Sequence, residues 1–207
     1  MKKNLIIFGS SGHAEEIFQC IDKDKYNFLG FVKKKNDVNK KKIYCFDDDV
    51  IKLSKKNLFG IVGVYDIKTR KDIIKKILSI QPKFNFISVL SKNSIVAKNS
   101  KVGKNVFIAN GVIINSNSNI GDHTVINTGS IIEHDCKINS FVNVSPNATI
   151  LGKVEILDEV FIGSGSIIQQ NTKINSKNTI GANSFVNKNI RLKNRVYFGN
   201  PVKVYKK

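Results

Sequence analysis

The chain has 207 residues, enough for one large domain or two small ones, and a formal net charge of +18 at pH 7. Its cationic residues are almost all lysine, they are spread along the whole chain, and no aromatic residues alternate with them, which argues against nucleic acid as a partner. The three cysteines lack paired spacing and no apolar run reaches the length of a membrane span, so we expect a cytoplasmic protein without a disulfide framework, a zinc site or membrane insertion.

The first part of the chain alternates strand-like and helix-like segments. Strands are expected at residues 5–8, 28–32, 58–64 and 84–89, and helices at 14–22, 47–53 and 66–80. The lysine-rich stretch 33–42 is expected to be a solvated loop. Such alternation predicts a small parallel sheet with flanking helices, which we assign to a domain over residues 1–90.

A short loop joins the first expected strand to the first expected helix. It consists of Gly9, Ser10, Ser11, Gly12 and His13. Glycines at this place allow backbone N–H groups to approach a phosphate at the positive end of the helix. The loop lacks the third glycine of a dinucleotide-binding fingerprint, so a second interpretation stays open, in which it is a tight turn packed for its own sake and His13 faces solvent.

The second part of the chain is organised by a repeat of six residues. From Val96 to Leu192 every sixth residue is Ile, Val or Leu, over 17 positions without interruption. This period fits neither an α-helix nor a plain strand, but it fits short strands that turn a corner every sixth residue. The positions four residues after each aliphatic one are mostly small, as a narrow triangular core requires. We therefore predict a parallel β-helix of about five coils over residues 91–207, ending in a short tail, in which residues 18 apart stack on adjacent coils.

Three motifs along the chain resemble those of a known family. They are the GSSGH loop at 9–13, the EHDC sequence at 133–136 within the repeats, and the GNPVK sequence at 199–203. Together they resemble the bacterial sugar O- and N-acyltransferases of surface-glycan synthesis, which include nucleotide-amino-sugar N-acetyltransferases and sialic-acid O-acetyltransferases. The resemblance covers essentially the whole chain. It implies a Rossmann-like sugar-nucleotide-binding domain, a left-handed β-helix acetyltransferase domain of hexapeptide repeats, acetyl-CoA as cosubstrate without a metal, and a homotrimer with active sites between neighbouring prisms.

His134 is the candidate catalytic base. Transfer of an acetyl group from a thioester needs a base for the acceptor's proton and hydrogen-bond donors for the carbonyl oxygen. His134 lies two residues after Ile132, outside the expected core, and Glu133 and Asp135 flank it. The resemblance implies that His134 is the general base and that Asp135 supports it. Without the motif, His134 would be interpreted as a surface histidine in a charged turn.

Four further residues are assigned to acetyl-CoA. Gly152 comes 18 residues after His134, so it is expected beside it on the next coil, where it leaves room for the thioester and its N–H can bond the acetyl oxygen. A glycine at a coil corner can also serve only to relieve backbone strain. The resemblance implies the same contact for Gly152. It also places Ser164 and Ala182 along the pantetheine arm, and Asn143 where family members often have a histidine near the coenzyme.

The expected sugar-nucleotide pocket departs from the family pattern. The resemblance assigns to it the loop 9–13, Gly63, and the pair Lys33 and Lys34 after the second strand. Family members commonly have an acidic pair at those two positions, and often a glycine where this chain has Tyr65. The identity of the nucleotide therefore stays open.

The remaining candidates concern the phosphates of the coenzyme and a second histidine. Basic residues near the C-terminus are expected to meet these phosphates: Lys188, Arg191, Lys193, Arg195 and Lys203. His123 is expected to be an exposed loop residue or a contact to a neighbouring subunit. It lies 11 residues from His134, not a multiple of 18, so the two do not predict a metal site.

The favoured function is acetyl transfer from acetyl-CoA to the amine of a nucleotide-linked amino sugar, such as a 4-amino-4,6-dideoxy sugar, because the loop 9–13 suits a phosphate. The runner-up is O-acetylation of a free or nucleotide-linked sugar of the sialic-acid type. A third alternative is a non-enzymatic scaffold or sensing protein, which would not require the turn around His134.

Overall fold

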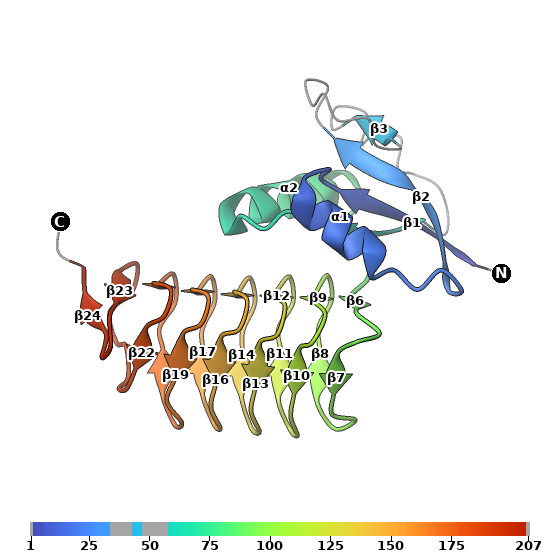
Figure 1. Cartoon of the computed structure of the whole chain (residues 1–207). Coiled ribbons are helices and arrows are strands. Elements are labelled where there is room, and N and C mark those ends of the chain that lie inside the picture. The colour runs from blue at the N-terminus through green and yellow to red at the C-terminus, as the bar shows by residue number, and fades with distance from the viewer. Residues whose placement is uncertain (1, 34–42, 47–57, 206–207) are drawn as a thin grey trace. The chain divides into compact units, whose positions relative to one another are not determined.

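The computed structural model describes residues 2–33, 43–46 and 58–205. The chain divides into two compact units, Met1–Val89 and Leu90–Lys207. The two units are the blue-to-green and the green-to-red parts of the ribbon in Figure 1, and each is described by itself.

In its described residues, the first unit is a parallel sheet with two helices. Its strands are β1 (Lys3–Phe8), β2 (Tyr26–Lys33), β3 (Ile43–Phe46), β4 (Leu58–Val62) and β5 (Asn85–Phe86), and its helices are α1 (Gly12–Gln19) and α2 (Ile67–Ile80). The strands are all parallel, in the order β3-β2-β1-β4-β5. The predicted parallel α/β fold is therefore confirmed. The strand β3 was not expected, and the helix expected at 47–53 lies outside the described residues.

The central strand β1 forms the core of this unit. Leu5, Ile6 and Ile7 in it are fully buried, as expected of a parallel strand that is covered on both faces. The helix α2 begins where an aspartate can cap it, because the Asp66 carboxylate accepts a hydrogen bond from the backbone N–H of Thr69 at 2.8 Å. The hydroxyl and the backbone N–H of Thr69 lower the pKa of Asp66. The expected strand at 84–89 is reduced to two residue pairs, β5 and β6 (Val89–Leu90).

The second unit is a parallel β-helix with three sheets, seen as the stacked coils of Figure 1. The first sheet contains β7 (Ile95–Val96), β10 (Ile113–Ile114), β13 (Ile131–Ile132), β16 (Thr149–Ile150), β19 (Ile167–Ile168) and β22 (Phe185–Val186). The second contains β8 (Lys101–Val102), β11 (Asn119–Ile120), β14 (Lys137–Ile138), β17 (Glu155–Ile156) and β20 (Lys173–Ile174). The third contains β6, β9 (Phe107–Ile108), β12 (Val125–Ile126), β15 (Asn143–Val144), β18 (Phe161–Ile162), β21 (Thr179–Ile180), β23 (Val196–Phe198) and β24 (Lys203–Val204).

The register of the strands has the predicted coil length. Ile114 pairs with Ile132, and Ile132 pairs with Ile150, so the partners are 18 residues apart. The second residue of these strands points inward and is fully buried, whereas the first points outward. Among the strands of the described residues, only β24 runs antiparallel, against β23, and this pair ends the sheet to which it belongs.

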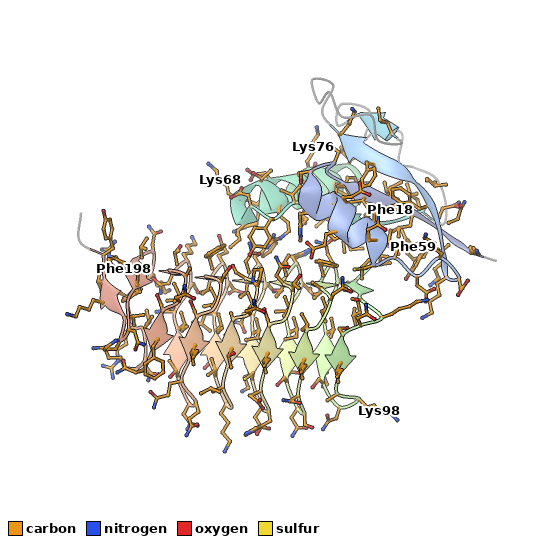
Figure 2. All side chains as sticks on the ribbon, viewed as in Figure 1. Phe18, Phe59, Lys68, Lys76, Lys98 and Phe198 are labelled. Carbon is orange, nitrogen blue, oxygen red and sulfur yellow. The ribbon has the colours of Figure 1, made fainter. Side chains whose placement is uncertain are left out.

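The corners between strands hold residues in the left-handed backbone region. Asn117, His123 and Asp135 have φ angles of 62°, 60° and 61°. Asparagine and aspartate tolerate this conformation better than most residues, which fits their frequency at these corners. Figure 2 shows the side chains of the coils, with Lys98 at one corner and Phe198 near the C-terminal end. Within the described residues, no helix is long and apolar enough to span a membrane.

Candidate functional site

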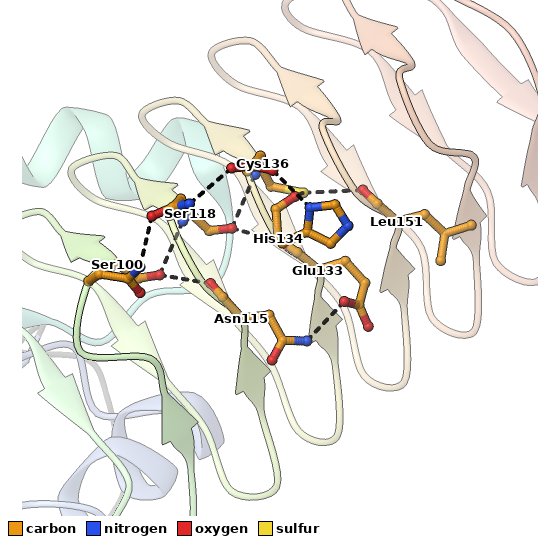
Figure 3. Close-up of polar contacts among 10 residues, drawn as sticks. Ser100, Asn115, Ser118, Glu133, His134, Cys136 and Leu151 are labelled. Carbon is orange, nitrogen blue, oxygen red and sulfur yellow. Dashed lines mark hydrogen bonds and ion pairs between the residues drawn. The ribbon is translucent and has the colours of Figure 1, made fainter.

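His134 projects from a corner of the β-helix, in the turn between β13 and β14 (Figure 3). Its side chain is 56% exposed, and its Nδ1 lies 2.8 Å from Oδ2 of Asp135. The two side chains come from adjacent residues, and the left-handed conformation of Asp135 sets the direction in which its carboxylate leaves the turn.

The charge of Asp135 determines which nitrogen of His134 carries hydrogen. The hydrogen bond with His134, followed by one from Asn117, holds the pKa of the Asp135 carboxyl below its ordinary value. An ionised carboxylate can only accept hydrogen bonds, so the hydrogen of a neutral imidazole lies on Nδ1. Nε2 is then left with a free lone pair, which is the form that a general base needs.

Gly152 lies against the ring of His134, as the 18-residue spacing predicts. A Cβ atom at Gly152 would stand 2.8 Å from both Cε1 and Nε2 of His134, closer than side-chain atoms approach one another. A larger residue at position 152 would therefore clash with the imidazole, and glycine leaves the Nε2 edge of the ring uncovered by a side chain.

The backbone of the His134 turn is braced from inside the coil (Figure 3). The hydroxyl of Ser118, on the preceding coil, donates to the carbonyl of Glu133 at 2.7 Å and accepts from the N–H of Cys136 at 3.1 Å. The thiol of Cys136 donates to the carbonyl of Leu151 on the next coil at 3.2 Å. Burial raises the pKa of Cys136 to about 11, so this thiol stays protonated and has a structural role.

The four residues assigned to acetyl-CoA lie in different parts of the coils. Ser164 and Ala182, both exposed, stack on adjacent coils at one corner. Gly152 lies at another corner beside His134, and Asn143 is the buried first residue of β15. The structure thus joins Gly152 to His134 and Ser164 to Ala182, and leaves their shared role a prediction.

Two glycines assigned to the sugar-nucleotide pocket have packing reasons. A Cβ atom at Gly63 would stand 2.8 Å from Ile7 and 2.9 Å from Ala14, so this glycine allows α1 to pack on the sheet. Gly9 has φ +103° and lies against Gly63, where the loops after β1 and β4 meet. Gly12, the first residue of α1, has open space around it. The structure therefore explains Gly9 and Gly63 without a ligand, but not Gly12.

His13 is mostly buried, which contradicts the interpretation that it faces solvent. Its side chain is 9% exposed, its Nδ1 lies 3.5 Å from Glu16, and its ring makes an edge contact with Tyr65, with centroids 5.3 Å apart. Ser10 in the same loop is also buried. The strands β1 and β4 are neighbours at the point where the strand order reverses, the place where parallel sheets bind ligands.

Arg70 was not expected from the sequence, although it holds the loop after β4 in place. It is fully buried on α2 and donates to the carbonyls of Val64 and Tyr65 at 2.9 and 2.8 Å. Desolvation lowers its pKa to about 10, so it stays charged at neutral pH. Lys33 ends β2 and is 5% exposed, whereas Lys34 lies outside the described residues.

The other candidates are His123 and the basic residues near the C-terminus. The ring of His123 stacks on Phe141, with centroids 4.7 Å apart. Among the described residues, no group of three or more His, Cys, Asp or Glu side chains could hold a metal ion. The basic residues near the C-terminus, Lys188, Arg191, Lys193, Arg195 and Lys203, are all exposed.

A groove of about 470 Å³ runs over β8, β11 and β14, and none of the predicted site residues lines it.

The fold and the site define a class of protein: an α/β unit whose strand order reverses between β1 and β4, followed by a hexapeptide β-helix that carries an exposed histidine–aspartate pair. Residues 4–77 match the family model of the PglD N-terminal domain. No match was found among curated proteins.

Solved structures share the fold over nearly the whole chain. The acetyltransferase domain of PglB from Neisseria gonorrhoeae, in complex with acetyl coenzyme A, has a TM-score of 0.90 at 22% identity and covers 99% of this chain and 100% of its own. PerB from Caulobacter crescentus, in complex with CoA and GDP-perosamine, has a TM-score of 0.89 at 23% identity over 98% and 97% of the two chains. WeeI from Acinetobacter baumannii has a TM-score of 0.83 at 19% identity over 97% and 99%. The predicted combination of an α/β unit and a left-handed parallel β-helix is thereby confirmed.

Proposed function

We propose that this protein transfers an acetyl group from acetyl-CoA to the amine of a nucleotide-linked amino sugar, a 4-amino-4,6-dideoxy sugar, in bacterial surface-glycan synthesis. The observation that carries the proposal is the pairing of His134 with Asp135 at an exposed corner, beside the bare backbone of Gly152. The match of residues 4–77 to the PglD N-terminal domain supports it. So does the similarity to structures that were determined with acetyl-CoA, or with CoA and GDP-perosamine.

The proposed chemistry uses His134 as the general base. Nε2 accepts a proton from the sugar amine while the amine nitrogen forms a bond to the thioester carbonyl. The N–H of Gly152 donates to the carbonyl oxygen as it becomes negative. The carbon–sulfur bond then breaks, and the imidazolium returns the proton to the leaving thiolate of CoA. Asp135 keeps the ring oriented and stabilises its positive charge.

Acetyl-CoA is proposed to run from the His134 corner toward the C-terminal coils. Gly152, Asn143, Ser164 and Ala182 would contact its thioester and pantetheine arm. The exposed basic residues near the C-terminus would meet its phosphates. Since acetyl-CoA is an intracellular metabolite, we place the protein in the cytoplasm.

The sugar nucleotide is proposed to bind in the α/β unit, at the crevice between the loops after β1 and β4. The N-terminus of α1, which follows Ser10 and Ser11, would receive a phosphate. Lys33 and Tyr65 differ from the family pattern at this crevice, so we expect them to influence which nucleotide is accepted.

A homotrimer is proposed because one face of the β-helix is apolar on its outside. The outward residues of the first sheet are mostly apolar: Ile95, Ile113, Ile131, Thr149, Ile167 and Phe185. Ile95 and Ile167 are 65% and 44% exposed. The second sheet instead directs Lys, Asn and Glu outward. An exposed apolar strip of this kind favours association with another copy of the chain.

Purified protein with acetyl-CoA and a panel of nucleotide sugars tests the proposal. Each sugar would be supplied with a free amine and, as the matched control, with a hydroxyl in its place, and release of the CoA thiol would be followed. We expect thiol release only with the amine. Turnover of the hydroxyl sugars alone would contradict N-acetylation, and a protein that neither binds acetyl-CoA nor releases CoA would contradict an enzymatic function.

A further inference from the structure

Side chains 18 residues apart form a hydrogen-bonded ladder along the corner that carries His134. Nδ2 of Asn99 donates to Oδ1 of Asn117 at 2.8 Å, and Nδ2 of Asn117 donates to Oδ1 of Asp135 at 3.2 Å. Each step of this ladder links one coil to the next. The ladder ends at the carboxylate that binds Nδ1 of His134.

The ladder has a direction. An asparagine side chain has a donor end and an acceptor end, and Asn99 occupies the acceptor end of Asn117. The NH₂ group of Asn117 is therefore the end that faces Asp135. A carboxylate presented with a donor on each oxygen cannot rotate without losing one of them: Oδ1 bonds Asn117, and Oδ2 bonds His134.

Other charged groups near Asp135 do not replace this contact. Lys153, at the equivalent position on the next coil, contributes to lowering the pKa of Asp135, but less than the hydrogen bonds from His134 and Asn117. Glu133, in the same turn, accepts a hydrogen bond from Asn115 at 2.9 Å (Figure 3). Asn117 is thus the neutral donor that reaches the free oxygen of Asp135.

We propose that Asn117 is a positioning residue for the reaction: its amide fixes the Asp135 carboxylate in the orientation that keeps hydrogen on Nδ1 of His134 and the lone pair on Nε2. Asn117 does not touch substrate, and it acts through Asp135. The inference rests on the proposed acetyl transfer for its effect on rate, but its effect on the imidazole can be measured without any substrate.

A role in the backbone alone would give a different result. Asn117 has φ 62°, a conformation that favours Asn, Asp and Gly, so it could be present only to form the corner. Asn117→Asp keeps the size and the backbone preference but replaces the donor by an acceptor facing Asp135. A backbone role predicts that this variant behaves as the natural protein, whereas a positioning role predicts that it is worse than Asn117→Gly, which only removes the donor.

The experiment compares Asn117→Asp and Asn117→Gly with matched changes at Asn171. Asn171 lies at the same corner two coils beyond Asp135, with φ 59° and an exposed side chain, and it forms no part of the ladder. The ring nitrogens of ¹⁵N-labelled histidine are observed by NMR at a pH where the imidazole is neutral. The chain has only three histidines, and His134→Gln identifies the signals of His134.

We expect hydrogen predominantly on Nδ1 of His134 in the natural protein and in Asn171→Asp and Asn171→Gly. In Asn117→Gly the hydrogen should redistribute toward Nε2, and in Asn117→Asp more so. In the acetyl-transfer assay kcat should fall about 10-fold in Asn117→Gly, as for loss of one hydrogen bond to a charged group, and further in Asn117→Asp, with KM for acetyl-CoA little changed.

An unchanged distribution of hydrogen in Asn117→Asp would overturn the inference, whether or not acetyl transfer is found. A redistribution that leaves kcat intact would also overturn it, because the orientation would then not matter for the reaction. If the natural protein releases no CoA with any acceptor, the proposed function fails separately, and the NMR result still decides the role of Asn117 toward His134.

Discussion

The imidazole of His134 lies against the backbone of Gly152, and a Cβ atom at Gly152 would stand 2.8 Å from both Cε1 and Nε2 of the ring. The two residues are 18 apart, so the coil length alone brings them together. Because Nδ1 donates its hydrogen to the carboxylate of Asp135, Nε2, the nitrogen beside Gly152, is the one that can accept a proton.

Gly152→Ala is expected to displace the His134 ring and to fill the space proposed for the thioester. A contact of 2.8 Å must be relieved, and the exposed imidazole moves more easily than the coil backbone. We expect kcat to fall by at least about 10-fold, since a misplaced base loses its geometry, while thermal unfolding changes little. Steady-state kinetics and calorimetric unfolding measure the two effects.

The same change in a protein that lacks the imidazole is the control. If Gly152→Ala lowers kcat by displacing the ring, the same change should have little further effect in a protein that already carries His134→Ala. The factor by which it lowers the rate should then be much smaller than in the natural protein. Equal factors in both backgrounds would show that the methyl group obstructs the substrate and not the base.

Asp135→Asn should reduce kcat less than loss of His134 does. Asparagine keeps the left-handed corner but removes the negative charge beside the ring. Without the carboxylate, the hydrogen of the neutral ring is no longer held on Nδ1, so part of the molecules should lose the lone pair on Nε2. An unchanged kcat in Asp135→Asn, measured by steady-state kinetics, would show that this carboxylate does not orient the base.

Asp66→Ala should destabilise the start of α2. The side chain of Asp66 caps the helix through Thr69, and loss of such a cap costs about 1 kcal/mol. The pKa of Asp66 is lowered in the folded protein, so its ionic contribution is present above the ordinary value of an aspartate and is lost as the pH falls through the lowered one. Hydrogen exchange of residues 67–70 at pH 7 and below pH 4 should show a difference that narrows in acid. A difference of constant size would exclude an ionic contribution.

The apolar face of the first sheet is expected to join copies of the chain. Light scattering should give about three times the chain mass of 23.1 kDa. Replacing Ile113 and Ile131 together by Glu should produce monomers, because charges in the outward strip oppose burial. Asn119→Glu, an outward position on the second sheet, is the matched control and should leave the assembly intact. A monomeric natural protein at micromolar concentration would contradict the trimer.

The β-helix could be predicted from the sequence in detail because its period is short and strict. Each aliphatic residue, such as Ile132, fills the same place in its coil, so one spacing determines strand positions, register and the neighbours of every corner. Gly152 could be placed beside His134 on this basis alone. The α/β unit has no such repeat, and β3 was missed because its four residues lie beside a lysine-rich stretch that indicates a loop.

Other parts of the site depend on side-chain directions that the sequence does not display. Arg70 lies on the same face of α2 as Ile74 and Ile77, but a charged residue is not expected to be buried there, and the sequence does not show that the carbonyls of the preceding loop bind it. Asn117 is one of many asparagines in the chain. The sequence distinguishes it only by its position 18 residues before Asp135, which places it next to Asp135 on the preceding coil. One interpretation of the sequence left His13 facing solvent. Its burial could not be predicted, because it depends on contact with Tyr65 from a distant part of the chain.

The rate of acetyl transfer by His134→Ala, measured with saturating acetyl-CoA and amino-sugar acceptor, tests the central claim most directly. Loss of a positioned base lowers a rate by about 10² to 10⁴, whereas binding of acetyl-CoA through other groups should persist within a small factor. His123→Asn, at a corner of the same backbone conformation, is the control and should change the rate little. The proposal predicts a strongly reduced kcat in His134→Ala with its affinity for acetyl-CoA retained. A near-natural kcat in that variant would contradict His134 as the base.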